Sequence, residues 1–205
     1  MTLRLGILGS TSGTDMQAII EAIQKDLDAE IAVVISNKKN AHILERARKS
    51  SLNALFIDPK GKTKREYDEE LNKELESKGV ELILLIGYMK IMSPWFVDKW
   101  YGKAMNIHPS LLPAFGGGMD KDVHQAVLDE GCKVTGCTLH FLTEEVDSGP
   151  IIAQKCVRVA ENETVDSLKE KVQKAEQEIM VQAIQWFGDG KIKLEGKKVR
   201  IKENN

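Results

Sequence analysis

The sequence has 205 residues, of which 42% are hydrophobic and 29% are charged, with 29 Lys and Arg against 31 Asp and Glu. This size and composition are typical of one globular domain, so we expect a single domain over residues 1–205. The net charge of -2 disfavours nucleic acid as a partner, and apolar runs such as Leu82–Ile86 are far shorter than the roughly 20 residues that cross a bilayer, so no membrane partner is expected.

Short aliphatic runs alternate with longer helix-patterned segments over the first half of the chain. The runs are Leu3–Leu8, Ile31–Ile35, Ala54–Ile57, Leu82–Ile86 and Ala104–Ile107, and the segments between them are Asp15–Lys25, Ala41–Lys49, Lys64–Lys78 and Pro94–Tyr101. This alternation is typical of a mostly parallel sheet with helices on both faces. We therefore predict an α/β, Rossmann-like fold with a twisted sheet.

The pattern changes after the fifth run. Val134–Phe141 and Ile151–Val159 are two extended segments with only a turn-forming stretch between them, which predicts an antiparallel pair at an edge of the sheet. A long helix should follow, opened by Thr164 as its cap. Lys191–Lys202 is predicted to form a short hairpin.

The first predicted strand runs into a loop of small residues, Gly9–Asp15, directly before a helix. Such a turn points free backbone N–H groups and the positive end of the helix dipole at a bound anion. The loop matches neither common nucleotide-binding fingerprint and has no lysine, so one phosphate monoester fits better than ATP. A plain helix cap without a ligand is the open alternative.

The fifth strand leads from Asn106 to His108 and then into a proline-rich turn. Alternation along a strand puts both side chains on one side, at the carboxyl end of a parallel sheet, where open α/β folds bind ligands. An Asn amide can donate to a developing oxyanion, and a His can donate to it or carry protons. This pair suits transfer of an acyl or formyl group to an amine, although a structural His beside a capping Asn is the alternative.

Asp147 lies in the turn between the two late strands, within Asp-Ser-Gly-Pro. Many such Asp residues only form Asx turns. If the loop instead folds back over the sheet end, the carboxylate would lie beside His108 and favour the imidazolium. His140, on the preceding strand, could form a further polar wall of the same pocket.

Several motifs, in chain order over roughly residues 3–187, resemble the folate-dependent formyltransferases, and within them the phosphoribosylglycinamide formyltransferases of purine synthesis. The matching segments are Gly13–Ile20, Ser36-Asn37, Leu44–Ala47, Gly87–Pro94, Asn106–Pro113 and Val146–Ile152. The Asn-x-His-Pro-Ser-Leu-Leu-Pro block with the later Asp-x-Gly-Pro is highly specific for enzymes that use formyl-folates.

The resemblance implies a one-carbon transferase that moves the formyl group of 10-formyltetrahydrofolate to the glycinamide amine of 5'-phosphoribosylglycinamide in de novo purine (IMP) biosynthesis. The products would be formylglycinamide ribonucleotide and tetrahydrofolate, and no metal is implied. Asn106 and His108 would stabilise the tetrahedral oxyanion, His108 would also handle protons, and Asp147 would keep that His charged and oriented. The substrates would both be small molecules, and the protein a monomer or a homodimer.

The resemblance also implies two sets of binding residues. The ribonucleotide would be held by Gly13, Thr14, Asp15, Gln173 and Glu176. The folate would be held by Lys64, Leu85, Met89, Lys90, Ile91, Met92, Val97, Asn106, His140, Thr143, Glu144, Glu145 and Asp147. For the two late-helix residues of the first set, a solvated polar face is the alternative.

The sequence departs from the family pattern at a few positions. Asp15 stands where the family often has Asn, which puts its contact with a phosphate in question, and Lys90 replaces a frequent Arg. Either Lys64 or Arg65 could be the basic residue near the folate glutamate tail, and spacing favours Lys64. The glycine-rich Gly116–Gly118 could close over substrate or be a plain connector.

Other functions remain as alternatives at this point. A formyltetrahydrofolate hydrolase or another folate-dependent formyltransferase would use the same core, but those that act on tRNA carry a further domain and a basic surface. A non-catalytic nucleotide-binding module would use the first loop alone and would leave Asn106, His108 and Asp147 unexplained.

The three cysteines, Cys132, Cys137 and Cys156, are odd in number and lack paired spacing, which argues against a disulfide framework and a structural zinc site. The N-terminus does not have the pattern of a secretory signal. We therefore expect a cytoplasmic protein.

Overall fold

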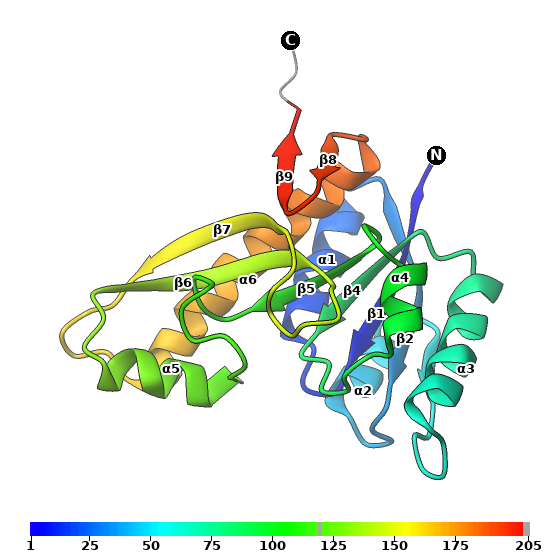
Figure 1. Cartoon of the computed structure of the whole chain (residues 1–205), viewed down its shortest axis with the longest axis horizontal. Coiled ribbons are helices and arrows are strands. Elements are labelled where there is room, and N and C mark those ends of the chain that lie inside the picture. The colour runs from blue at the N-terminus through cyan, green and yellow to red at the C-terminus, as the bar shows by residue number, and fades with distance from the viewer. Residues whose placement is uncertain (119, 203–205) are drawn as a thin grey trace. The chain divides into compact units, whose positions relative to one another are not determined.

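The structure, a computed structural model, describes residues 1–118 and 120–202 and divides into two compact units. The first unit comprises Met1–Asn106 and Leu142–Glu144, and the second comprises Ile107–Phe141 and the chain from Glu145 onward. Figure 1 traces the chain through its helices and strands.

The first unit is built on parallel strands in the order β3-β2-β1-β4-β5. The strands are β1 (Leu3–Gly9), β2 (Ala29–Ser36), β3 (Ala54–Phe56), β4 (Leu82–Ile86) and β5 (Ala104–His108), and the helices between them are α1 (Thr14–Lys25), α2 (His42–Lys49), α3 (Lys64–Ser77) and α4 (Pro94–Lys99). After β3 the chain crosses to the far side of β1, so the strand order reverses between β1 and β4. Open α/β sheets bind ligands outside the carboxyl ends of the strands at such a reversal.

Local signals and an apolar core explain why α3 and α4 form where they do. Thr63 caps α3 in a capping box with Glu66, and Ser93 caps α4 with Pro94 in the first turn. The core joins α3 and α4 to β1, β2 and β4. Its members include Leu8, Val33, Ile35, Tyr67, Leu71, Leu75, Ile83, Leu85, Phe96 and Trp100.

The second unit continues from the end of β5 through an antiparallel pair. Its elements are α5 (Asp120–Asp129), β6 (Val134–Phe141), β7 (Ile151–Arg158), α6 (Val165–Gly188), β8 (Ile192–Glu195) and β9 (Lys198–Ile201). Helix α6 packs along β6 and β7 and against α5 (Figure 1). A stripe of buried side chains at helical spacing makes this contact: Leu168, Val172, Ala175, Ile179 and Ala183.

The predicted fold class is confirmed, because a mostly parallel sheet in the order β3-β2-β1-β4-β5-β6-β7 ends in an antiparallel edge pair. The cap at Thr164 and the final hairpin are confirmed too. The sequence analysis gives no bounds for helix α5, because a glycine run precedes it. No helix within the described residues is both long enough and apolar enough to cross a bilayer.

Candidate active site

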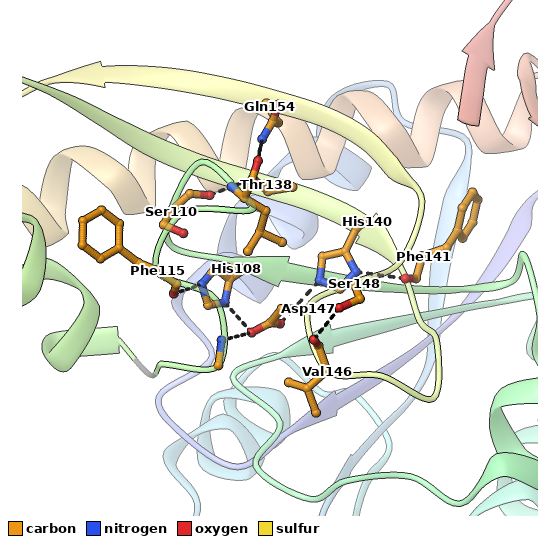
Figure 2. A network of polar contacts seen from close by, with 12 residues as sticks. His108, Ser110, Phe115, Thr138, His140, Phe141, Val146, Asp147, Ser148 and Gln154 are labelled. Carbon is orange, nitrogen blue, oxygen red and sulfur yellow. Dashed lines mark hydrogen bonds and ion pairs between the residues drawn. The ribbon is translucent and has the colours of Figure 1, made fainter. Parts of the chain in front are cut away.

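Strand β5 delivers His108 into a polar cluster of the second unit, where its side chain is almost completely buried. Its Nδ1 lies 3.2 Å from Asp147 Oδ2, and its Nε2 lies 2.9 Å from the carbonyl oxygen of Phe115 (Figure 2). Both ring nitrogens therefore face acceptors. A neutral imidazole carries one N–H and can donate to only one of them, whereas the imidazolium can donate to both.

Asp147 holds the centre of this cluster from the loop between β6 and β7. Its Oδ2 also accepts a hydrogen bond from the Gly117 N–H at 2.9 Å, and its Oδ1 lies 3.7 Å from His140 Nε2. Burial alone would raise the pKa of the Asp147 carboxyl, but the facing His140, the Gly117 N–H and His108 outweigh it and hold that pKa below its ordinary value. The carboxylate is thus kept ionised between two imidazoles.

The backbone of this loop explains how Asp147 reaches its place. Asp147 has a left-handed φ of 54°, which Asp adopts more readily than most residues. A Cβ atom at Gly149 would lie 1.7 Å from the Phe141 carbonyl oxygen and 3.1 Å from His140 Nδ1, so the chain passes too closely there for any other residue. The Phe141 carbonyl also accepts a hydrogen bond from His140 Nδ1 at 2.9 Å, which leaves Nε2 facing the carboxylate.

A second set of hydrogen bonds fixes the turn that follows His108. The Thr138 hydroxyl donates to the Ser110 carbonyl at 2.7 Å and accepts from the Leu112 N–H at 3.0 Å. Gln154 Nε2 donates to that same hydroxyl and to the Leu112 carbonyl, each at 3.0 Å (Figure 2). The hydroxyl is fully buried and its hydrogen-bonding capacity is filled, so the turn from Ser110 to Leu112 is held firmly.

Sequence reasoning missed four contributors to this cluster: Phe115, Gly117, Thr138 and Gln154. Two of them act through backbone atoms, which carry no residue-type signal. Thr138 had one usable signal, because it lies two residues before His140 on β6 and side chains two apart on a strand share a face.

In the first unit, the loop after β1 leads into α1 at Gly13, whose φ is 65° and whose added Cβ would lie 2.4 Å from Ile43. Gly13 stands at the N-cap position and has no side chain to accept from the backbone N–H groups of the first turn. Asp15 points inward and is buried in the first turn. Of this predicted phosphate segment, Gly13 is buried and Thr14 half-buried.

A cavity of about 400 Å³ adjoins the beginning of the same loop. It is lined by Ser10, Thr11, Ser12, Lys38, Asn40, Ala41 and His42. The loop itself has no lysine, but the fold brings Lys38, from the end of β2, to its side. The cavity therefore has beside it a lysine that the loop sequence does not supply.

The apolar residues predicted to bind folate lie on β4, in the loop after it and on α4, and they fall into two groups. Leu85, Met92 and Val97 are buried, whereas Met89 and Ile91 expose 38% and 57% of their surface. Met89 and Ile91 are thus the two apolar residues of the predicted folate set that reach the surface.

The basic residues in and near the loop after β4 differ in the contacts that they make. Lys90 Nζ lies 4.7 Å from the centre of the Tyr67 ring. Arg65 pairs with Glu69 and stacks 3.8 Å from the centre of the Trp95 ring, and Lys64 is exposed. Arg65 is thus engaged in contacts within its own helix and with α4.

The remaining predicted residues lie on β5, in the loop after β6 and on α6. Asn106 is half-buried on β5, paired in register with Leu85 of β4. Thr143 is half-buried, and the two glutamates after it, Glu144 and Glu145, are exposed. On α6, Gln173 is half-buried and Glu176 is buried; they are three residues apart and so share one helix face, and Glu176 does not lie on the solvated face that the sequence left open.

Within the second unit the structure therefore brings His108, His140 and Asp147 into one cluster. Within residues 1–118 and 120–202, no group of three or more His, Cys, Asp or Glu side chains has the arrangement of a metal site. The cysteines of this part of the chain are free thiols. The chemistry available to the cluster is proton transfer and hydrogen bonding to a developing negative charge.

Comparison with known proteins gives consistent results. Residues 3–184 match the formyl transferase family. The phosphoribosylglycinamide formyltransferase of Haemophilus influenzae is 36% identical over 193 residues, which are 93% of this chain and 90% of that protein. The crystal structure of glycinamide ribonucleotide transformylase 1 from Symbiobacterium toebii superposes with a TM-score of 0.93 at 39% identity, covering 98% of this chain and 95% of that one.

Longer animal proteins are similar as well. The trifunctional purine biosynthetic protein adenosine-3 of Gallus gallus is 41% identical over 194 residues, which are 94% of this chain. The aligned part is 19% of that protein, so the chain spans about a fifth of the length of these relatives.

Proposed function

The chain belongs to the formyl transferase family, and from that premise we propose that it transfers the formyl group of 10-formyltetrahydrofolate to the glycinamide amine of 5'-phosphoribosylglycinamide. The relatives named for this reaction support transfer rather than hydrolysis of the formyl-folate. The observation that carries the proposal is the 3.2 Å contact between His108 Nδ1 and the ionised Asp147, in a member of this family.

In the proposed reaction the glycinamide nitrogen attacks the formyl carbon of the folate. A new carbon–nitrogen bond forms and the formyl oxygen takes a negative charge, which Asn106 and His108 stabilise by donating hydrogen bonds. The bond from the formyl carbon to N10 of the folate then breaks, and the proton lost by the amine reaches N10 with His108 as the carrier. Asp147 stabilises the imidazolium form, which His108 holds before it gives its proton to N10 and regains when it takes the proton of the amine.

The proposal gives His108 Nε2 the task of donating to the formyl oxygen. In the structure this nitrogen faces the Phe115 carbonyl, so substrate oxygen must replace that carbonyl before reaction. The fixed Nδ1 contact to Asp147 keeps the ring oriented during the exchange.

The binding residues form part of the proposal. The phosphate end of the ribonucleotide would bind at the backbone donors of Gly13–Asp15, with Gln173 and Glu176 reaching its ribose or glycinamide. Asp15 is buried in the first helical turn, where its charge lies at the positive end of the α1 dipole, and this supports a structural role rather than direct phosphate contact.

The folate would bind along the exposed Met89 and Ile91, over the buried Leu85, Met92 and Val97, with Lys64 and Lys90 near its carboxylates. Arg65 is held by Glu69 and Trp95, which supports Lys64 as the basic residue near the glutamate tail. The polar wall of the folate site would comprise Asn106, His140, Thr143, Glu144, Glu145 and Asp147.

We further propose that residues 1–205 act as one formyltransferase domain in the cytoplasm, as a monomer or homodimer, without a metal, nucleic acid or membrane partner. Sedimentation of the purified protein would measure the assembly state.

One assay tests the proposed reaction. The protein is incubated with 10-formyltetrahydrofolate, with and without phosphoribosylglycinamide, while the absorbance of the folate is followed. Turnover that requires the ribonucleotide is the expected result. Turnover without it would establish hydrolysis instead, and no turnover in either mixture from folded protein would refute both reactions.

A further inference from the structure

Helix α3 carries a buried carboxylate that the proposed reaction does not use. Asp68 is 0% exposed, and its Oδ2 accepts a hydrogen bond from the Ser93 N–H at 2.5 Å. Its Oδ1 has no hydrogen-bond partner among the residues that the structure describes. Burying a carboxylate with one oxygen unsatisfied costs folding free energy, which packing alone does not offset.

The charge of Asp68 is only partly compensated by its surroundings. Burial raises the pKa of the Asp68 carboxyl, while the Ser93 hydrogen bonds and the charges of Lys90 and Lys64 act in the opposite direction. The two lysines that attract this carboxylate are the two that the proposed function places near the folate carboxylates.

The partner of Asp68 is the residue that ends the proposed folate segment and caps α4. In an ordinary capping box the third residue of the helix accepts the N–H of the cap, but here that residue is Phe96, which has no acceptor. Asp68 supplies the missing acceptor from α3, and its negative charge lies at the positive end of the α4 dipole.

The beginning of the same segment is held by a second buried polar side chain. The Ser10 hydroxyl accepts a hydrogen bond from the Met89 N–H at 2.8 Å, and the Ser10 N–H donates to the Gly87 carbonyl at 3.1 Å. Ser10 therefore holds the backbone at Met89 and Asp68 holds it at Ser93, and the exposed Ile91 lies between these two hydrogen bonds along the chain.

Residue Tyr67, next to Asp68 on α3, makes two further contacts with the segment. Its hydroxyl lies 2.9 Å from the hydroxyl of Tyr88, and its ring lies under the ammonium of Lys90. Tyr67 is itself fully buried in the core of the first unit. Two consecutive residues of α3 thus contact three positions of the segment, Tyr88, Lys90 and Ser93.

We propose that Asp68 is a positioning residue for folate binding, which acts by accepting the Ser93 N–H and so setting the path of Tyr88–Met92. The proposal rests on the proposed function in assigning folate to this segment. Asp68 is fully buried, so its effect falls on folate affinity through the path of the segment rather than on the chemistry at His108.

Three variants separate positioning from general stability. Asp68→Ala removes the acceptor, and Asp68→Asn keeps an acceptor oxygen while removing the charge. Asn72→Ala is the matched control, because Asn72 lies one turn further along α3, is buried, and its Oδ1 accepts a hydrogen bond from Trp100 Nε1 at 3.0 Å. That variant also breaks a buried α3–α4 contact, but at the end of α4 away from the folate segment.

The measurement is the dissociation constant of tetrahydrofolate, the product of the proposed transfer, by anaerobic calorimetry, with the melting temperature of each variant recorded. We expect Asp68→Ala to weaken binding by about tenfold, the size of one lost charge-assisted hydrogen bond. Asp68→Asn and Asn72→Ala should stay within about threefold of the unmodified protein.

The following results would overturn the proposed role of Asp68 or the proposed function. Unchanged affinity in Asp68→Ala overturns the proposal, and so does a loss in Asn72→Ala as large as that in Asp68→Ala, since the effect would then be structural. Failure of Asp68→Asn to recover affinity also overturns it. Unmodified protein that binds tetrahydrofolate but transfers no formyl group refutes the proposed function alone, whereas unmodified protein that binds no folate refutes both.

Discussion

Replacing Asp147 by Asn removes one negative charge from beside His108 while leaving an oxygen that can occupy the place of Oδ2. That oxygen can still accept from the Gly117 N–H and from His108 Nδ1, so the geometry is largely kept. What is lost is the attraction between carboxylate and imidazolium, on which the proposed oxyanion stabilisation depends.

The size of the loss follows from the distance and the burial. At 3.2 Å, Coulomb's law gives about 1 kcal/mol for two unit charges in bulk water and about 5 kcal/mol at an effective dielectric constant of about 20. The Asp147 side chain is 9% exposed, so we take an intermediate value of about 3 kcal/mol. Because about 1.4 kcal/mol corresponds to a tenfold change, kcat should fall by about two decades.

The assay is steady-state turnover with both substrates at saturation, followed by folate absorbance. Ser148→Ala is the control for disturbing the loop, because its hydroxyl only donates to the Val146 carbonyl at 3.1 Å and the residue is exposed; kcat should stay within about twofold. If Asp147→Asn retains more than about a tenth of the normal kcat, the electrostatic role is wrong.

A double-mutant cycle then asks whether Asp147 acts through His108. The combined variant Asp147→Asn with His108→Asn should be no more than about threefold slower than His108→Asn alone, since the carboxylate has no imidazolium left to stabilise. Full additivity of the two losses would contradict that coupling.

Three further outcomes are expected. His108→Asn should lower kcat by about two or more decades with an unchanged circular dichroism spectrum, because a proton carrier is lost. Thr138→Val should lower the free energy of unfolding in urea by about 2–4 kcal/mol, since the Ser110 carbonyl and the Leu112 N–H lose their buried partner, whereas Thr138→Ser should recover most of it. The pKa of Asp147 is depressed in the folded protein, so its contribution to stability is complete above the unfolded value of about 3.8 and is lost as pH falls through the lower folded value. The difference in unfolding free energy between the unmodified protein and Asp147→Asn should therefore shrink below about pH 4, and a difference that grows there would contradict the assigned direction.

Features encoded over short stretches of chain were predictable. The alternation of aliphatic runs with amphipathic segments predicts the strands and helices of the first unit to within one or two residues at most ends, because residue periodicity follows backbone geometry. The spacing of Asn106 and His108 is equally local, since two residues on one strand share a side.

Helix α5 shows where local signals weaken. The glycine run before it predicts a loop and gives no bound for a helix. The sequence does not single out Asp68, because other charged residues surround it along the chain. It is buried because α4 packs against α3, which no pattern within α3 reports.

Amino-acid order alone therefore specifies most of the secondary structure, the fold class and the chemical types available at the strand ends. The distances that turn those types into a site depend on contacts between segments far apart in the chain. Asp147 could have been a simple turn residue, and it lies 3.2 Å from His108 because Gly149 lets the chain pass against the Phe141 carbonyl and because Gly117 and His140 hold the carboxylate. Contacts of this kind depend on the packing of the whole unit. The residues that stabilise them are far apart in the chain, so no short stretch of sequence contains them all.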